Sequence, residues 1–252
     1  MIPLFKSHYS IGKSILTLDS PASEYGPASI RSLVNKHQID PLVLVEDSLI
    51  GFLEAKTLAD ALGIQLIFGL RLDACSDMSV KITRNSDECL HKLVIFAKNS
   101  EGCKLLNKIY TVAFTQGGGK IDFTALEKLY DKDLLAIAIP FYDSFLFHNL
   151  FSYRKPCILD HSFFEPTFFL ENNLLPFDHV LREVVVDYAT KEKFPLQEVK
   201  SIYYENRADF EAYQTYKCVC GRGFSSRALT LDKPNLDHCG SPEFCLESYL
   251  ES

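Results

Sequence analysis

The stretch LVLVEDSLIGFLEAKTLADALGIQLIFG, residues 42–69, decides the fold class. It begins with a short apolar run at 42–45, which is typical of a buried strand. Residues 52–62 follow a helical period and end at Gly63, a residue common just beyond the last turn of a helix. A second apolar run, 64–69, follows at once. Two buried strands joined by one amphipathic helix form a βαβ unit, so the stretch predicts a parallel sheet covered by helices.

The same alternation extends in both directions from this unit. Residues 28–35 have helical spacing, with Pro27 in the first turn, and Ser100 is the expected N-cap of a later helix. The further predicted elements are strands at 92–97 and 134–139, helices at 100–110, 123–129 and 209–216, and strand or helix at 168–170 and 184–188.

These elements predict a single α/β domain over residues 1–252, with a loop-rich part from about 221 to 252 and no cleavable linker. We expect a barrel with parallel strands at about 42–46, 64–69 and 92–97.

Charge and hydropathy exclude two classes of protein. The 252 residues include 26 Lys and Arg against 33 Asp and Glu, a formal net charge of −7, which does not suit non-specific binding to phosphate backbones. No apolar run approaches the ~18 residues of a membrane-spanning helix, and the first residues lack the apolar core of a secretion signal. We therefore expect a cytoplasmic protein that makes no contact with membranes.

The eight cysteines are expected to be reduced thiols, several of them buried, because no secretion signal is visible. Cys218, Cys220, Cys239 and Cys245, with His238, could supply zinc ligands. Their spacing matches none of the usual zinc motifs and favours ordinary thiols, so zinc binding by this cluster stays open.

The remaining motifs indicate no active site by themselves. The run GGGK at 117–120 is followed by Ile121 and Asp122 rather than Ser or Thr, so it predicts a flexible turn and not a phosphate loop. The seven histidines are scattered, with no HxH or HExxH pair. Glu46 and Asp47 follow a predicted strand. At this position they could serve as metal ligands, cap a helix, or form a solvated acidic pair.

Six ordered segments resemble the polymerase-and-histidinol-phosphatase (PHP) domain that begins bacterial DNA polymerase III α subunits. They are residues 5–10, 44–55, 62–69, 96–102, 203–213 and 238–244. The resemblance implies a distorted (β/α)7 barrel of PHP type, similar to a TIM barrel, whose metal site lies at the carboxyl ends of the strands.

Carried over residue by residue, the metal-binding positions of that family look degenerate. They fall on Leu4, Lys6, Glu46, Asp47, Arg71, Lys200, Ser201 and Tyr203. Leu4 and Lys6 replace an HxH pair, and the cations Lys6 and Arg71 would repel metal ions. We expect no metal, no cofactor and no catalytic residue here, and structural ion pairs of Lys6 and Arg71 with Glu46 and Asp47. A cationic pocket for phosphate or a DNA backbone is the alternative.

The resemblance therefore implies a structural or interaction module in DNA replication without phosphoesterase activity. Its expected partners are the remainder of the polymerase, in cis or in trans, and a proofreading exonuclease subunit, with DNA reached only through the polymerase. The parent protein would be the nucleotidyltransferase, since this chain lacks room for the palm, fingers and thumb. The alternative is a metal-dependent phosphoesterase or 3′–5′ exonuclease of the PHP superfamily.

Overall fold

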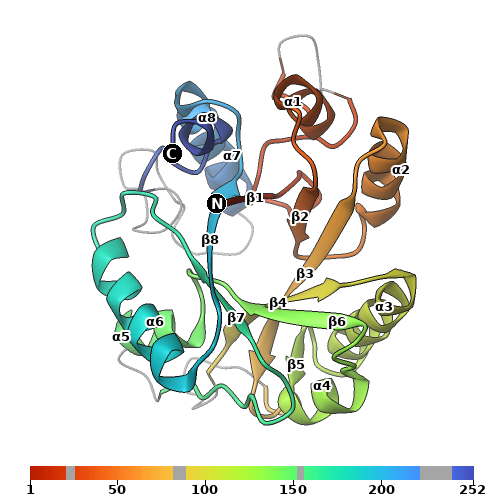
Figure 1. Ribbon diagram of the computed structural model, residues 1–252, viewed down its shortest axis with the longest axis vertical. Helices are drawn as coiled ribbons and strands as arrows, with labels where there is room; N and C mark the ends of the chain where they lie inside the picture. Colours follow the sequence, from red (N-terminus) through yellow and green to blue (C-terminus); the bar gives the residue numbers. More distant parts are fainter. Residues whose placement is uncertain (21–25, 82–88, 152–155, 222–239) are drawn as a thin grey trace. The chain divides into compact units, whose positions relative to one another are not determined.

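The computed structural model describes residues 1–20, 26–81, 89–151, 156–221 and 240–252. Strands and helices alternate along these ranges, so the fold is mixed α/β, as the sequence predicts (Figure 1). The chain divides into two compact units. Unit 1 comprises Met1–Phe68, Glu171–Asp178 and Val199–Ser252, and unit 2 comprises Gly69–Leu170 and His179–Glu198.

Unit 1 is built around three parallel strands. Its elements are β1 (Ile2–Phe5), α1 (Ile30–His37), β2 (Leu42–Glu46), α2 (Phe52–Leu62), the end of β8 (Leu196–Ile202), the 3-10 turn η1 (Arg207–Asp209), α7 (Phe210–Gly221) and α8 (Leu246–Leu250). Strand β1 pairs in parallel with β2 and with β8, so Leu4 has Val43 on one side and Ser201 on the other. The carboxyl ends of these three strands therefore meet at one edge of the sheet.

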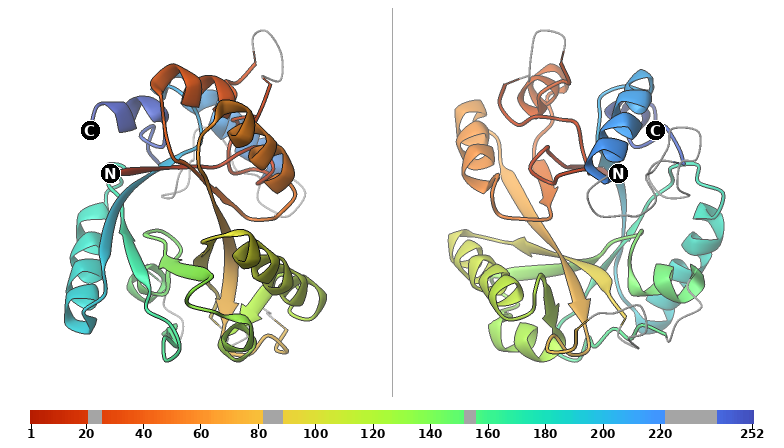
Figure 2. Two further views of the ribbon diagram at one scale, coloured as in Figure 1. Left: turned by 45° about the vertical axis from the view of Figure 1, so that its right-hand side comes forward. Right: turned by 180° about the vertical axis from the view of Figure 1, so that it is seen from behind.

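Unit 2 combines parallel and antiparallel pairings. Its elements are β3 (Leu66–Cys75), β4 (His91–Ala97), α3 (Ser100–Thr115), β5 (Lys120–Asp122), α4 (Phe123–Leu129), β6 (Leu135–Ile139), α5 (Phe145–Phe151), β7 (Thr167–Leu170), α6 (Asp178–Glu192) and the start of β8. Strand β4 runs antiparallel to β3 and β6, whereas β6, β7 and β8 are parallel to one another. Helices α3 and α4 lie side by side next to β5 (Figure 2).

The hydrogen-bonded order of the strands is β2-β1-β8-β7-β6-β4-β3-β5, and β2 also pairs with β3. Seven strands are thus hydrogen-bonded in a closed ring that contains both parallel and antiparallel pairs, and β5 lies outside the ring. The α/β class and the barrel are confirmed, but the expectation that segments 42–46, 64–69 and 92–97 are all parallel is wrong, because β4 is antiparallel to β3. No helix lies in the described residues between β3 and β4, and an antiparallel neighbour needs only a loop where a parallel one needs a crossover.

Local signals fix most helix ends. Gly63 ends α2 with a left-handed φ of 68°, as predicted. The N-cap of α1 is Ser29, whose hydroxyl accepts from the Ser32 amide, so Pro27 lies outside the helix. Asn99 rather than Ser100 caps α3, through a hydrogen bond from the Gly102 amide.

The remaining expectations for individual segments are settled as follows. Residues 168–170 lie in strand β7 and residues 184–188 in helix α6. The glycines at 117–119 form a turn between α3 and β5, with Gly118 and Gly119 at φ of 62° and 98°. A side chain at Gly117 would come within 1.9 Å of the Lys120 carbonyl oxygen, so only glycine fits there.

One cysteine pair departs from the expected reduced state. Cys89 and Cys157 form a disulfide, with Cα atoms 5.4 Å apart and 68 positions between them in the sequence. Only the fold brings two such distant residues together, so no local spacing could have indicated the pair. Among the described helices, none is long and apolar enough to cross a lipid bilayer.

Candidate functional site

Seven of the eight positions that the resemblance marks as a degenerate metal site lie at the carboxyl ends of β2, β1 and β8 in unit 1. They are Leu4, Lys6, Glu46, Asp47, Lys200, Ser201 and Tyr203. The parallel register explains the grouping, because Leu4 lies opposite Ser201 and the Lys6 amide donates to the Ile202 carbonyl at 3.2 Å. The eighth position, Arg71, belongs to unit 2.

Glu46 is the centre of the first group of polar contacts. Its side chain has no solvent exposure and accepts hydrogen bonds from the Ser7 amide at 2.8 Å and from the Ser10 hydroxyl. Ser10 Oγ in turn accepts from the Asp47 amide at 2.9 Å. Burial raises the pKa of Glu46 above its ordinary value, and Lys6, Ser10 and Ser7 oppose that rise.

Lys6 supplies the positive charge beside these carboxylates. The residue is only 4% exposed, and its Nζ donates to Asp47 Oδ1 at 2.9 Å. The expected Lys6–Asp47 ion pair is therefore present. An ammonium thus stands at the end of β1, next to the carboxylates at the end of β2.

A second buried carboxylate, Glu171, was not anticipated from the sequence. It follows β7 and accepts from the Ser201 amide at 3.0 Å, the Ser201 hydroxyl at 2.9 Å and Asn173 Nδ2 at 3.0 Å. Burial raises its pKa, opposed by these donors and by Lys200. The sequence did hold a signal, since Glu171 ends an apolar strand in the same way as Glu46 ends β2.

Lys200 is the counterpart of Lys6 on β8. It is 4% exposed, and its Nζ donates to the Asn172 carbonyl at 3.0 Å. Burial lowers the pKa of Lys200, while Glu171 is the strongest of the acidic groups that counter the shift. The buried Glu46 and Glu171 of unit 1 therefore each have a buried lysine in their electrostatic neighbourhood.

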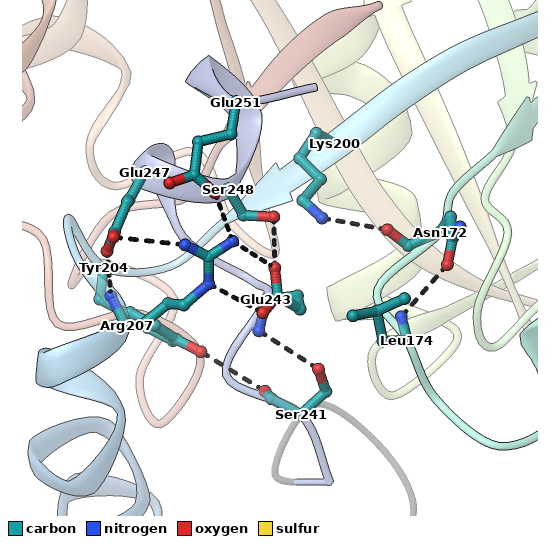
Figure 3. A network of polar contacts seen from close by, with 10 residues as sticks. All are labelled: Asn172, Leu174, Lys200, Tyr204, Arg207, Ser241, Glu243, Glu247, Ser248 and Glu251. Atoms are coloured by element: carbon teal, nitrogen blue, oxygen red, sulfur yellow. Dashed lines mark hydrogen bonds and ion pairs between the residues drawn. The ribbon is translucent and has the colours of Figure 1, made fainter.

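An arginine network lies to one side of Lys200, whose ammonium points toward Asn172 (Figure 3). The Arg207 guanidinium binds Glu243 through two hydrogen bonds of 2.8 and 2.9 Å, Glu247 at 3.2 Å and Glu251 at 2.8 Å. The hydrogen bonds that Arg207 donates to Glu243 and Glu251 raise its pKa. Because Glu247 lies in α8 and Arg207 begins η1, the network fastens the C-terminal helix beside β8.

Arg71 has its own partner in unit 2. It lies within β3, is 8% exposed, and its Nη2 donates to Asp143 Oδ2 at 2.6 Å. Asp143 was not anticipated from the sequence. The expected pairing of Arg71 with Glu46 or Asp47 would join the two units and stays a prediction.

The remaining positions offer poor metal ligands. Leu4 has no donor atom, and the Tyr203 ring, 7% exposed, stacks against Phe244 at 5.5 Å and Tyr213 at 5.9 Å. Within the described ranges, no three His, Cys, Asp or Glu side chains form a group that could hold a metal ion. With hydrogen-bond donors already on Glu46 and Glu171 and ammonium groups beside them, the residues do not fit a cluster of divalent ions.

The cysteine cluster is only partly described. Cys218, Cys220 and Cys245 are free thiols, whereas Cys239 and His238 lie outside the described residues. Burial raises the pKa of the Cys245 thiol, which favours the protonated form over a metal-binding thiolate.

Comparison with known proteins adds no family assignment: no family model and no curated protein matches this sequence. Inference about function therefore depends on the residues at the strand ends.

Proposed function

We propose that the chain is a metal-free, non-catalytic module of the PHP type in DNA replication. It would be the N-terminal part, or a separately encoded part, of a DNA polymerase III α subunit. The resemblance in sequence and the α/β barrel of seven strands support this proposal. The observation that carries it is the set of buried lysines, Lys6 and Lys200, among the carboxylates at the strand ends.

Charge explains why this site would work without metal. Two or three divalent ions at strand ends hold acidic side chains together, and their loss leaves buried carboxylates that repel one another. Here Lys6 Nζ lies 2.9 Å from Asp47 Oδ1, and its charge opposes the rise in the pKa of Glu46 that burial causes. The charge of Lys200 likewise opposes the rise in the pKa of Glu171. An ammonium in that place satisfies the acids and repels a divalent ion.

The role that follows is support and docking. The partners we propose are the remainder of the polymerase, in cis or in trans, and a proofreading exonuclease subunit, with DNA reached through the polymerase. The proposed compartment is the cytoplasm, where bacterial replication occurs.

The test combines a binding measurement with an activity measurement. The full chain is mixed with a polymerase III α subunit that lacks its own N-terminal domain, and the complex is measured by size-exclusion chromatography with light scattering. In parallel, Mn²⁺ and Zn²⁺ are titrated calorimetrically, and hydrolysis of a phosphoester and of single-stranded DNA is assayed. We expect a stoichiometric complex, no stoichiometric metal and no turnover.

The opposite pattern would support the phosphoesterase or exonuclease alternative. Stoichiometric metal together with turnover that Glu46→Ala or Asp47→Ala abolishes would refute the metal-free proposal. A chain with neither complex nor turnover would refute the docking role alone.

A further inference from the structure

A second site of a different kind lies in unit 2. A pocket of about 680 Å³ is lined by the start of β6, the end of α6 and the loops before β6 and β7. This volume is in the range of small-molecule sites, which span about 300–1,000 Å³. The pocket lies at the opposite end of β6 from Asp143, the partner of Arg71, so it is separate from the positions discussed above.

Aromatic rings form much of its wall. Tyr130 and Phe163 lie 5.7 Å apart between ring centroids, and His161 packs edge-on against Phe194 at 5.0 Å. All four side chains are partly exposed, whereas Phe164, 4.9 Å from Phe163, is buried and anchors the loop. Flat rings held by buried neighbours yet open to solvent provide surfaces on which another planar ring can stack.

Two lysines stand beside the aromatic wall. Lys98 Nζ donates to the Lys132 carbonyl at 2.5 Å, and the Lys98 amide donates to the Leu134 carbonyl at 2.9 Å. An ammonium carries three donor hydrogens, so Lys98 keeps donors for an anion after this contact. Lys132 lines the same pocket, and its side chain is exposed. Both lysines therefore line the same pocket as Tyr130.

Two glutamates line the pocket as well. Glu165 and Glu192 balance the formal charge of Lys98 and Lys132, so a bare phosphate ion gains little net attraction here. Their carboxylates can accept hydrogen bonds from the amino group of a base, as glutamate does with cytosine. Burial and the nearby Glu165 raise the pKa of Tyr130, which keeps its phenol protonated and its ring neutral.

We propose that this pocket binds a nucleotide, with an amino-bearing base stacked on Tyr130 and in edge contact with Phe163, whose ring is inclined at 67° to that of Tyr130, and a phosphate held by Lys98 and Lys132. The ligand could come from two sources with the same chemistry, a free nucleoside monophosphate or the 5′-phosphorylated end of a single strand. The proposal does not rest on the polymerase-related function above, because its residues are a separate set.

Calorimetric titration of the full chain tests the proposal. The ligands are AMP, adenosine, ribose 5-phosphate and a 5′-phosphorylated oligodeoxyadenylate. We expect AMP to bind more tightly than either fragment, because only AMP uses both the rings and the lysines. Tighter binding of the oligonucleotide than of AMP assigns the site to a strand end, and the reverse order assigns it to a free nucleotide.

Matched variants locate the binding. Tyr130→Leu should weaken AMP binding about tenfold, the usual effect of losing one stacking partner, whereas Tyr130→Phe keeps the ring and the affinity. Lys132→Met should weaken AMP binding about fivefold and leave adenosine unchanged. The controls are Tyr110→Leu and Lys108→Met on α3, which lie outside the pocket.

Three results would overturn the proposal. The first is no saturable AMP or oligonucleotide binding up to about 10 mM. The second is binding that Tyr130→Leu and Lys132→Met leave unchanged while both proteins remain folded by circular dichroism. The third is ribose 5-phosphate binding as tightly as AMP, which would indicate an anion site without base stacking.

Discussion

Replacing Lys6 with Met tests whether an ammonium stabilises the strand-end carboxylates of unit 1. The substitution removes the charge and keeps most of the apolar stem of a side chain that is 5% exposed. Removing one member of a fully buried ion pair costs about 3–5 kcal/mol. Since the Asp47 side chain is 29% exposed while Glu46 has no exposure, we expect a loss at the lower end, about 3 kcal/mol at neutral pH.

The loss should depend on pH in a defined direction. Burial holds the pKa of Glu46 above its ordinary 4.5, so the folded state binds more protons than the unfolded state between these two values. The free energy of unfolding therefore falls as pH rises through that window. Lys6 lowers the pKa of Glu46, so its removal widens the window, and the deficit of Lys6→Met should be smallest in acid and largest above neutral pH.

Urea unfolding followed by circular dichroism measures the effect at acidic and slightly alkaline pH. The matched control is Lys56→Met, which removes an exposed ion pair with Asp60 on α2 and should cost at most about 0.5 kcal/mol. The double variant Lys6→Met with Glu46→Gln should recover most of the loss. A Lys6→Met deficit no larger than that of Lys56→Met, or one that does not change with pH, would refute the reasoning.

Three further predictions address other buried or networked groups. Glu171→Gln should flatten the fall in unfolding free energy above pH 4.5 that the raised pKa of Glu171 produces, and parallel urea profiles for variant and wild type would contradict this. Burial lowers the pKa of His91 from 6.5 to about 4, so the folded state should lose about 3 kcal/mol as pH falls through that interval; His91→Leu should remove this loss, and an unchanged acid dependence of the melting temperature would count against it. Arg207→Met should release α8, which would be measured as faster amide hydrogen exchange at residues 246–250 than in the wild type. High salt should reduce this difference in exchange rate between variant and wild type. Equal exchange rates at low salt would show that the network does not hold the helix.

The fold was predictable where its causes are local. The stretch 42–69 contains two apolar runs, one helical period and a glycine stop, and the structure places β2, α2 and the start of β3 there. The direction of β4 was not predictable in the same way, because an apolar run of this kind is equally typical of a parallel and of an antiparallel strand. Its orientation depends on neighbours in β3 and β6 that pattern alone does not reveal.

The site shows the same division between local and long-range causes. Resemblance led to Lys6, Glu46 and Asp47; Glu46 and Asp47 lie at the end of a strand that the sequence identifies, whereas the strand before Lys6, β1, was not predicted. Glu171 ends an apolar strand, as Glu46 does, but its contact with Ser201, 30 positions away, was not predictable, and Asp143 was missed because its partner Arg71 lies 72 positions away. Hydrogen bonds across such separations are set by packing and leave no periodic signal in the chain.

The buried position of Lys6 also has an evolutionary consequence. A single substitution that restores a metal ligand at position 6 yields a protein whose buried Glu46 has lost its neighbouring ammonium. Selection for stability removes such variants. Descendants of this chain should therefore keep lysine there across long divergence. An alignment of them would show an invariant basic residue beside carboxylates at a strand end, a pattern usually taken as a sign of catalysis, at a position that folding maintains.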